Sequence, residues 1–267
     1  MSTVAKAFTH GHPALVGYLP AGFPTVDGAI EAAKAMTRAG ADVIEIGLPY
    51  SDPLMDGPVI AEAVHRALSS GTKVRDVLNT VEAVASTGTP TLVMTYWNPV
   101  DQYGAESFAR DLAKAGGAGL ITPDLTPEEA GPWLKASDEH GLDRVFLVAP
   151  STTAERIAAI TGQCRGFVYA ASLMGITGTR TAVSGGAHAL VDRTRQHTDL
   201  PVAVGLGVST KEQAAEVAAF ADGVIVGSAF VRRLLDAPDQ TQAVAAIRQL
   251  TEQLSAGTRG TPGYIRR

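Results

Sequence analysis

Cysteine is nearly absent from this sequence, with Cys164 the single one among 267 residues. An intramolecular disulfide is therefore excluded. A chain of this length buries enough apolar surface to fold without a disulfide or a metal ion as a staple. The low cysteine content is typical of a reducing compartment, so we expect a cytoplasmic protein.

Long hydrophobic runs and clusters of positive charge are also lacking. No apolar run reaches the roughly 18–20 residues of a membrane span, and residues 1–13 lack the apolar core of a signal peptide. The net charge is −5, and no basic stripe runs through the chain. We therefore expect neither a membrane nor a nucleic acid as partner.

The sequence lacks the residues that several kinds of catalysis require. A Schiff-base aldolase needs a lysine inside the protein core, and a metal-dependent aldolase needs clustered ligands. The histidines fall on helical patterns or, for His10 and His12, in a start that we expect to be irregular, so they predict no metal cluster. No dinucleotide-binding fingerprint or P-loop is present. All six lysines fall outside the predicted strands: Lys6, Lys34, Lys73, Lys114, Lys135 and Lys211.

The chain does contain short apolar runs that alternate with amphipathic segments. Such alternation predicts a parallel sheet, and uniformly apolar strands indicate that both of its faces are covered. Eight such units in this length favour an α/β fold with a closed (β/α)8 TIM barrel as a single domain. An open doubly wound sheet is the alternative, but its Gly-rich first turn is missing. The expected strands are 14–18, 42–48, 91–96, 118–122, 144–149, 166–170, 201–205 and 222–226.

The predicted barrel spans residues 1–256 and is followed by a flexible basic tail, 257–267. Two connections are longer than the others. Residues 49–72 follow the second strand, and the segment PVIAEAVHRAL within them is expected to form an extra helix. Residues 171–186 follow the sixth strand. Long connections in a compact domain are often functional, and both lie at the face where barrel enzymes hold their active sites.

Glu45 is a carboxylate within an apolar strand. Because side chains alternate across a strand, Glu45 lies opposite the face that carries Ile44, Ile46 and Leu48. The aliphatic face suits packing against helices, so Glu45 is expected to point into the barrel, where burial raises the pKa of a carboxyl group. A general acid/base role is favoured over a structural ion pair, since no inward strand position offers a cation.

Asp52 and Asp56 occupy the Pro-rich loop that follows this strand. Asp and Pro are common in turns, so a purely structural role is the alternative for both. Asp56 is a candidate catalytic residue, and Asp52 is expected to cap or orient the loop.

Glycines mark the ends of the seventh and eighth strands. Gly205 and Gly207 flank one turn, while Gly227 and Ser228 open a short helix. In TIM barrels these two positions commonly bind phosphate through backbone N–H groups and a helix N-terminus. Gly178, in the loop after the sixth strand, is expected to add a donor.

Tyrosines end three of the strands, at Tyr18, Tyr96 and Tyr169. Aromatic side chains there either pack within the barrel or line a flat apolar pocket, and the pattern does not separate the two.

Together these motifs resemble the tryptophan synthase alpha chain family over nearly the whole chain. The most specific is the pattern at 44–58. The motifs are IEIGLPYSDPLMDGP at 44–58, YWNPV at 96–100, PDLTPEE at 123–129, GITG at 175–178, GLGVS at 205–209 and VGSAF at 226–230.

The resemblance implies a TIM-barrel lyase that cleaves indole-3-glycerol phosphate to indole and glyceraldehyde 3-phosphate in tryptophan biosynthesis. It implies Glu45 as the acid/base group and Asp56 as the second catalytic carboxylate, with Thr177 contacting that aspartate when the site closes. The implied phosphate ligands are Gly178, Gly207, Gly227 and Ser228, and the implied indole pocket is Tyr18, Met94, Tyr96, Tyr169 and Leu206.

The resemblance also implies a partner, a beta chain that carries pyridoxal phosphate in an α2β2 complex, and no cofactor on this chain. The sequence departs from the family pattern at Phe23, at Val59–Ala61 and at Leu206. Two alternatives therefore stay open: a stand-alone lyase without a beta chain, and a non-catalytic barrel that activates a partner. A different phosphate-binding barrel enzyme leaves the acidic loop unexplained.

Overall fold

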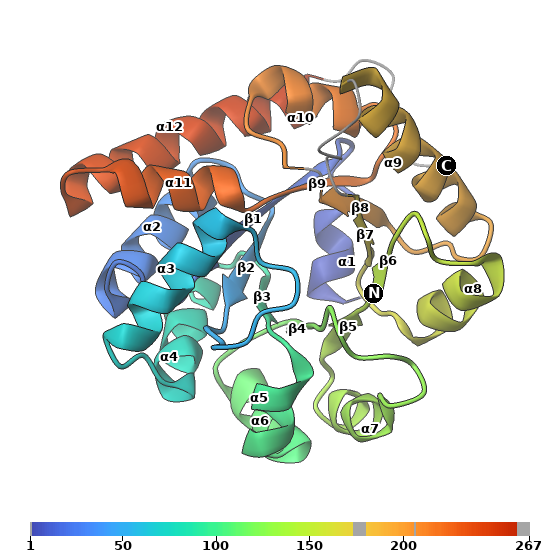
Figure 1. The fold of residues 1–267 in the computed structure, drawn as a ribbon, viewed down its shortest axis with the longest axis horizontal. Helices are drawn as coiled ribbons and strands as arrows, with labels where there is room; N and C mark the ends of the chain where they lie inside the picture. The colour runs from blue at the N-terminus through green and yellow to red at the C-terminus, as the bar shows by residue number, and fades with distance from the viewer. Residues whose placement is uncertain (1, 173–179, 206, 261–267) are drawn as a thin grey trace.

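The protein is a ring of parallel strands surrounded by helices (Figure 1). The computed structural model describes residues 2–172, 180–205 and 207–260. All strand pairs are parallel, in the order β5-β4-β3-β2-β1-β9-β8-β7-β6. The strands are β1 (Ala14–Pro20), β2 (Val43–Gly47), β3 (Thr91–Met94), β4 (Gly119–Ile121), β5 (Asp143–Val145), β6 (Leu147–Val148), β7 (Val168–Ala171), β8 (Val202–Gly205) and β9 (Gly223–Val226).

The ring closes through one continuous stretch of chain. β5 and β6 are separated only by Phe146, yet β5 pairs with β4 and β6 pairs with β7. The strand predicted at 144–149 is therefore divided in two, because the chain changes its hydrogen-bonded neighbour from one side to the other. The predicted (β/α)8 barrel is confirmed, and the open sheet is excluded.

The helices cover the outside of the ring, except for α1. The extra helix predicted within 49–72 is confirmed as α3. The helices are α1 (Thr3–Ala7), α2 (Val26–Arg38), α3 (Pro58–Ser69), α4 (Val74–Ala85), α5 (Trp97–Tyr103), α6 (Ala105–Lys114), α7 (Gly131–Glu139), α8 (Ala154–Gln163), α9 (Arg180–Arg195), α10 (Lys211–Ala218), α11 (Ser228–Asp236) and α12 (Gln240–Arg259). In the part of the chain that the structure describes, no helix combines the length and apolar character needed to cross a membrane.

Strand alternation produces two separate apolar layers. Ile44 and Ile46 belong to the layer between strands and helices, whereas Val43 and Leu92 belong to a smaller cluster inside the barrel. Each strand is buried on both faces because one face meets helices and the other meets the opposite wall of the barrel.

The start of the chain contains a helix that the sequence pattern did not predict, α1, while residues 8–13, which include His10 and His12, form turns and bends as expected. Ser2 caps α1 by accepting a hydrogen bond from the Ala5 N–H, and α1 lies within the ring of strands in Figure 1. Phe8 is fully buried against Phe167, with ring centroids 5.3 Å apart. The helix was missed because α1 is too short to show helical periodicity, while its apolar residues fill the open base of the barrel.

The last helix passes the predicted end of the barrel at residue 256. α12 continues to Arg259, and Gly257 and Thr258 are buried. Gly257 approaches α10 so closely that a Cβ atom there would lie 2.4 Å from the Lys211 carbonyl oxygen. Gly257 therefore allows α12 to pack closely against α10 and does not end the helix.

Candidate active site

Glu45 points into the barrel from β2. It is aligned with Tyr18 of β1 and Leu92 of β3, and its side chain is fully buried. Val43, two residues earlier on the same face of the strand, belongs to the cluster inside the barrel. The inward orientation that strand alternation predicts is therefore confirmed.

The buried carboxyl group of Glu45 has no compensating partner among the described residues. Neither carboxyl oxygen accepts a hydrogen bond there, and no ion pair in that part of the chain includes Glu45. Burial raises the pKa of Glu45 to about 8. The free protein thus holds a protonated carboxylic acid at neutral pH in a position that a purely structural role does not explain.

Replacement of Glu45 by Gln is expected to stabilise the fold at alkaline pH. The unfolded chain releases this proton near pH 4.5 and the folded chain near pH 8, so the folded chain binds more protons in between. The free energy of unfolding of the wild type therefore falls across this window, by at most about 1.4 kcal/mol per pH unit. Urea denaturation at pH 5 and pH 8 measures the gain of E45Q, which should be larger at pH 8.

Glu62→Gln is the matched control, since Glu62 is exposed on α3 and pairs with Arg66. An E45Q gain that is equal at the two pH values would contradict the raised pKa.

Asp56 is held at the mouth of the barrel by Tyr96. The Tyr96 hydroxyl donates to Asp56 Oδ1 over 3.0 Å and accepts the Met55 N–H over 2.9 Å. Burial raises the pKa of Asp56, while the hydrogen bond from Tyr96 lowers it. Two contacts thus fix the acidic loop to the end of β3. Asp52 is exposed and accepts a hydrogen bond from its neighbour Ser51.

Tyr18 lies near both carboxyl groups. Its side chain is buried, and its pKa is raised well above the usual value by burial and then by the charges of Asp56 and Glu45. Burial followed by the charge of Glu45 also raises the pKa of Tyr169. The structure therefore gathers Glu45, Asp56 and the three predicted tyrosines around one space at the barrel mouth.

Glycines leave room for these phenol rings. A Cβ atom on Gly47 would lie 2.3 Å from the Tyr18 hydroxyl oxygen, and one on Gly205 would lie 2.5 Å from that of Tyr169. Such separations are shorter than atoms tolerate, so a larger residue at either position displaces a ring. Both tyrosines consequently reach across to the neighbouring strand.

Asp124 anchors the backbone directly after Tyr96, a contact that the sequence pattern did not reveal. Its two carboxyl oxygens accept the Trp97 N–H over 2.9 and 3.1 Å, at the start of α5 directly after Tyr96. Asp124 lies in the PDLTPEE motif, but only the pairing of β3 with β4 reveals which backbone group it meets.

Tyr96→Phe is expected to lower kcat/KM for the reaction proposed below about tenfold, the effect of losing one hydrogen bond to a charged group. Steady-state kinetics measures this loss. The matched control is Tyr103→Phe, which removes a tyrosine–aspartate hydrogen bond to Asp111 on the helical surface. Equal effects of the two variants would show that Tyr96 does not position Asp56.

The predicted phosphate-binding glycines Gly207 and Gly227 follow the ends of two neighbouring strands, β8 and β9. Gly227 directly precedes α11, whose first N–H groups lack acceptors within the helix and attract an anion. Gly207 has φ +69°, a conformation that favours glycine. A Cβ atom on Gly227 would lie 3.4 Å from the Tyr18 ring, so this helix start borders the space around Glu45.

The remaining candidates divide into two groups. Met94 is partly buried and contacts the apolar layers inside and outside the barrel. Thr177, Gly178 and Leu206 lie outside the described residues. All six lysines are described, and none lies on a strand, as predicted.

Known proteins share both the sequence and the fold. The family model described as "Tryptophan synthase alpha chain" matches residues 4–259. The tryptophan synthase alpha chain of Thermobifida fusca is 58% identical, and the alignment covers 96% of each chain. That of Acidothermus cellulolyticus is 60% identical, and the alignment covers 98% of this chain and 99% of the relative.

Solved structures of tryptophan synthases share this fold. A tryptophan synthase from M. tuberculosis in an aminoacrylate-bound form superposes with a TM-score of 0.88 at 50% identity, covering 97% of this chain and 100% of the other. Tryptophan synthase subunit alpha from Legionella pneumophila gives 0.89 at 33% identity, covering 97% and 99%. With a family match and relatives that extend over nearly its whole length, this chain belongs to the tryptophan synthase alpha chain family.

Proposed function

We propose that this chain is the alpha subunit of a tryptophan synthase and cleaves indole-3-glycerol phosphate to indole and glyceraldehyde 3-phosphate. The observation that carries the proposal is the buried carboxyl group of Glu45, with a pKa of about 8 and no partner among the described residues. An acid of that strength exchanges protons readily near neutral pH.

The cleavage requires two proton movements. Protonation of the indole ring at C3 gives an indolenine, and removal of the proton from the adjacent side-chain hydroxyl then lets the C–C bond break. The electron pair of that bond returns to the ring, which leaves as indole, and the hydroxyl oxygen becomes the aldehyde of glyceraldehyde 3-phosphate. Glu45 is protonated in the free protein and is placed to supply the first proton and take the second.

Asp56 is proposed to stabilise the charged ring. A positive charge develops on the indolenine nitrogen after C3 is protonated, and a nearby carboxylate both offsets that charge and accepts the N–H. The hydrogen bond from Tyr96 favours the ionised form of Asp56 and fixes its position. Tyr18 and Tyr169 then supply flat apolar walls for the ring.

The phosphate group is proposed to bind at Gly207, Gly227 and Ser228. Binding at the start of α11 fixes the far end of the substrate, so its free energy helps to align the reacting bond with Glu45. Gly178 and Thr177 are proposed to join the site from the loop after β7.

The proposed partner is a beta chain that carries pyridoxal phosphate and receives indole within an α2β2 complex. Support comes from the loop that holds Asp56, where the apolar side chains of Leu54 and Met55 are 74% and 48% exposed. Exposed large apolar groups beside an active site are typical of a protein interface.

Purified chain, assayed for indole release from indole-3-glycerol phosphate with and without a beta chain, tests the proposal. Release that the beta chain strongly stimulates supports the synthase subunit. Full activity without stimulation supports the stand-alone lyase instead. Absence of indole release, together with normal activation of the beta chain, supports a non-catalytic activator.

A further inference from the structure

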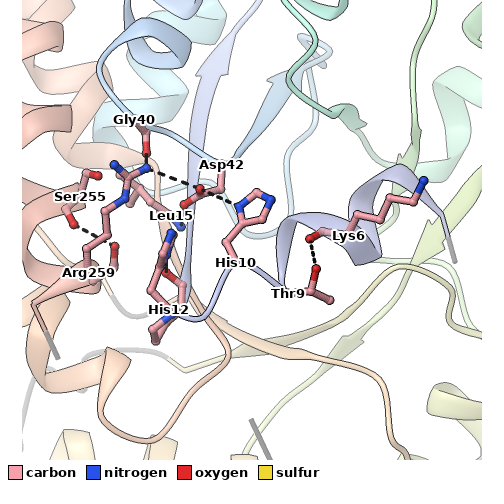
Figure 2. A network of polar contacts seen from close by, with 11 residues as sticks. Lys6, Thr9, His10, His12, Leu15, Gly40, Asp42, Ser255 and Arg259 are labelled. Carbon is pink, nitrogen blue, oxygen red and sulfur yellow. Dashed lines mark hydrogen bonds and ion pairs between the residues drawn. The ribbon is translucent and has the colours of Figure 1, made fainter. Parts of the chain in front are cut away.

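A second polar cluster lies at the opposite end of the barrel from Glu45. It consists of His10, His12 and Asp42, which precede the first residues of β1 and β2 (Figure 2). One ligand atom from each residue lies within 4.8 Å of the others. Two imidazoles and a carboxylate form a donor set that transition metals prefer.

The local sequence brings the two histidines together. Gly11 separates them and has φ +79°, in a turn where a Cβ atom would meet nothing within 4 Å. The turn therefore presents both rings on the side of Asp42. Asp42 is itself anchored, since its Oδ2 accepts the Leu15 N–H over 2.8 Å, and this leaves Oδ1 toward His10.

The hydrogen bonding of His12 leaves a free lone pair. Its Nδ1 lies 3.1 Å from the Pro13 carbonyl oxygen, which accepts only if Nδ1 carries the proton. Nε2 is then unprotonated and available as a metal ligand, with the backbone carbonyl fixing the tautomer, as at many histidine–metal sites.

The spacing of His10 and Asp42 fits two ligands of one ion better than a hydrogen bond. His10 Nδ1 and Asp42 Oδ1 are 3.6 Å apart. Two ligands about 2.0–2.1 Å from a tetrahedral ion are roughly 3.3 Å apart, so this pair needs a shift of only a few tenths of an ångström. The ligand atom of His12 lies within 4.8 Å of the other two and moves inward with the exposed turn when an ion binds.

We propose that His10, His12 and Asp42 bind one divalent transition-metal ion of the zinc class, with a water molecule as fourth ligand. Mg2+ and Ca2+ are excluded from the proposal because they prefer oxygen ligands alone. Bound metal ties the turn after α1 to the start of β2, at the base of the barrel and away from the active site.

Arg259 competes with the ion. Its Nη2 lies 3.7 Å from Asp42 Oδ1 and donates to the Gly40 carbonyl oxygen over 3.2 Å. Figure 2 shows Asp42 between the Arg259 guanidinium and the His10 ring. A cation beside the carboxylate weakens metal binding, so loss of the charge must strengthen it. A purely structural role of the cluster predicts no such gain.

Titration calorimetry of the full chain without an affinity tag, using ZnCl2 and MgCl2 as probes, tests the proposal. The wild type is expected to bind one Zn2+ and no Mg2+. His10→Gln and His12→Gln should each weaken Zn2+ binding at least about tenfold. Arg259→Gln should tighten it about fivefold, the effect of one unit charge about 4 Å away near water.

His188→Gln is the matched control, because His188 forms a similar pair with Asp192, 3.6 Å away, without a second histidine. Its Zn2+ affinity should equal that of the wild type. The proposal is overturned if the wild type shows no saturable Zn2+ binding, if His12→Gln binds as the wild type does, or if Arg259→Gln weakens binding. Circular dichroism of each variant identifies any that fails to fold.

Discussion

Glu45→Gln is expected to reduce indole release from indole-3-glycerol phosphate by about 10²–10⁴-fold, the range that one acid/base group contributes. Gln has nearly the shape of the protonated acid but cannot transfer a proton, so the space around Tyr18 and Tyr169 is preserved. The proposed phosphate ligands Gly207, Gly227 and Ser228 follow β8 and β9 or begin α11, and they do not contact this group in our proposal. Affinity for glycerol 3-phosphate, measured by calorimetry, should therefore stay unchanged.

Near-normal turnover of E45Q would remove Glu45 from the chemistry. Loss of glycerol 3-phosphate binding together with turnover would instead show that the substitution disturbs the whole barrel mouth. Glu62→Gln serves again as the control for an exposed carboxylate, and it should match the wild type in both measurements.

Asp56→Asn should have the second largest effect, a loss of about 10²-fold or more in kcat. The amide oxygen still accepts the hydrogen bond from Tyr96, so the loop keeps its position while the negative charge is lost. Single-turnover kinetics, which separates chemistry from product release, measures this loss.

Asp52→Asn is the matched control, because Asp52 lies in the same loop but is exposed and contacts Ser51. Equal losses in the two variants would indicate that loop structure, rather than the charge of Asp56, sets the rate. A normal rate in D56N would exclude the proposed stabilisation of the indolenine.

The two carboxyl groups suit different tasks because their surroundings differ. Glu45 is fully buried without a partner among the described residues, which favours its neutral form, a proton donor. Asp56 is partly exposed, and although burial raises its pKa, the hydrogen bond from Tyr96 opposes that shift by favouring the charged form. Two carboxyl groups in one site whose surroundings differ in this way commonly divide acid and electrostatic roles.

Periodic patterns predicted the parts of the fold that depend on local sequence. The eight strands, the extra helix α3 and the inward orientation of Glu45 follow from alternation of two residues in strands and from helical spacing. Each of these properties belongs to a segment and its immediate neighbours along the chain, so the order of residues is sufficient to specify it.

Contacts between distant segments could not be predicted in the same way. The hydrogen bond from the Trp97 N–H to Asp124 depends on two strands becoming neighbours, and the order of α1 depends on an open barrel base that only the closed ring creates. The change of strand partner at Phe146 and the burial of Gly257 against α10 also depend on contacts between segments that are distant in the sequence.

The sequence by itself thus determined the barrel, the catalytic candidates and the resemblance to a family of lyases. Only the tertiary structure decided how the candidates act on one another: that Tyr18 lies near both Glu45 and Asp56, and that His10, His12 and Asp42 meet at the base. The reason is physical. A strand sets the direction of its side chains locally, whereas burial, charge and the distance between side chains are set by the elements that pack around them.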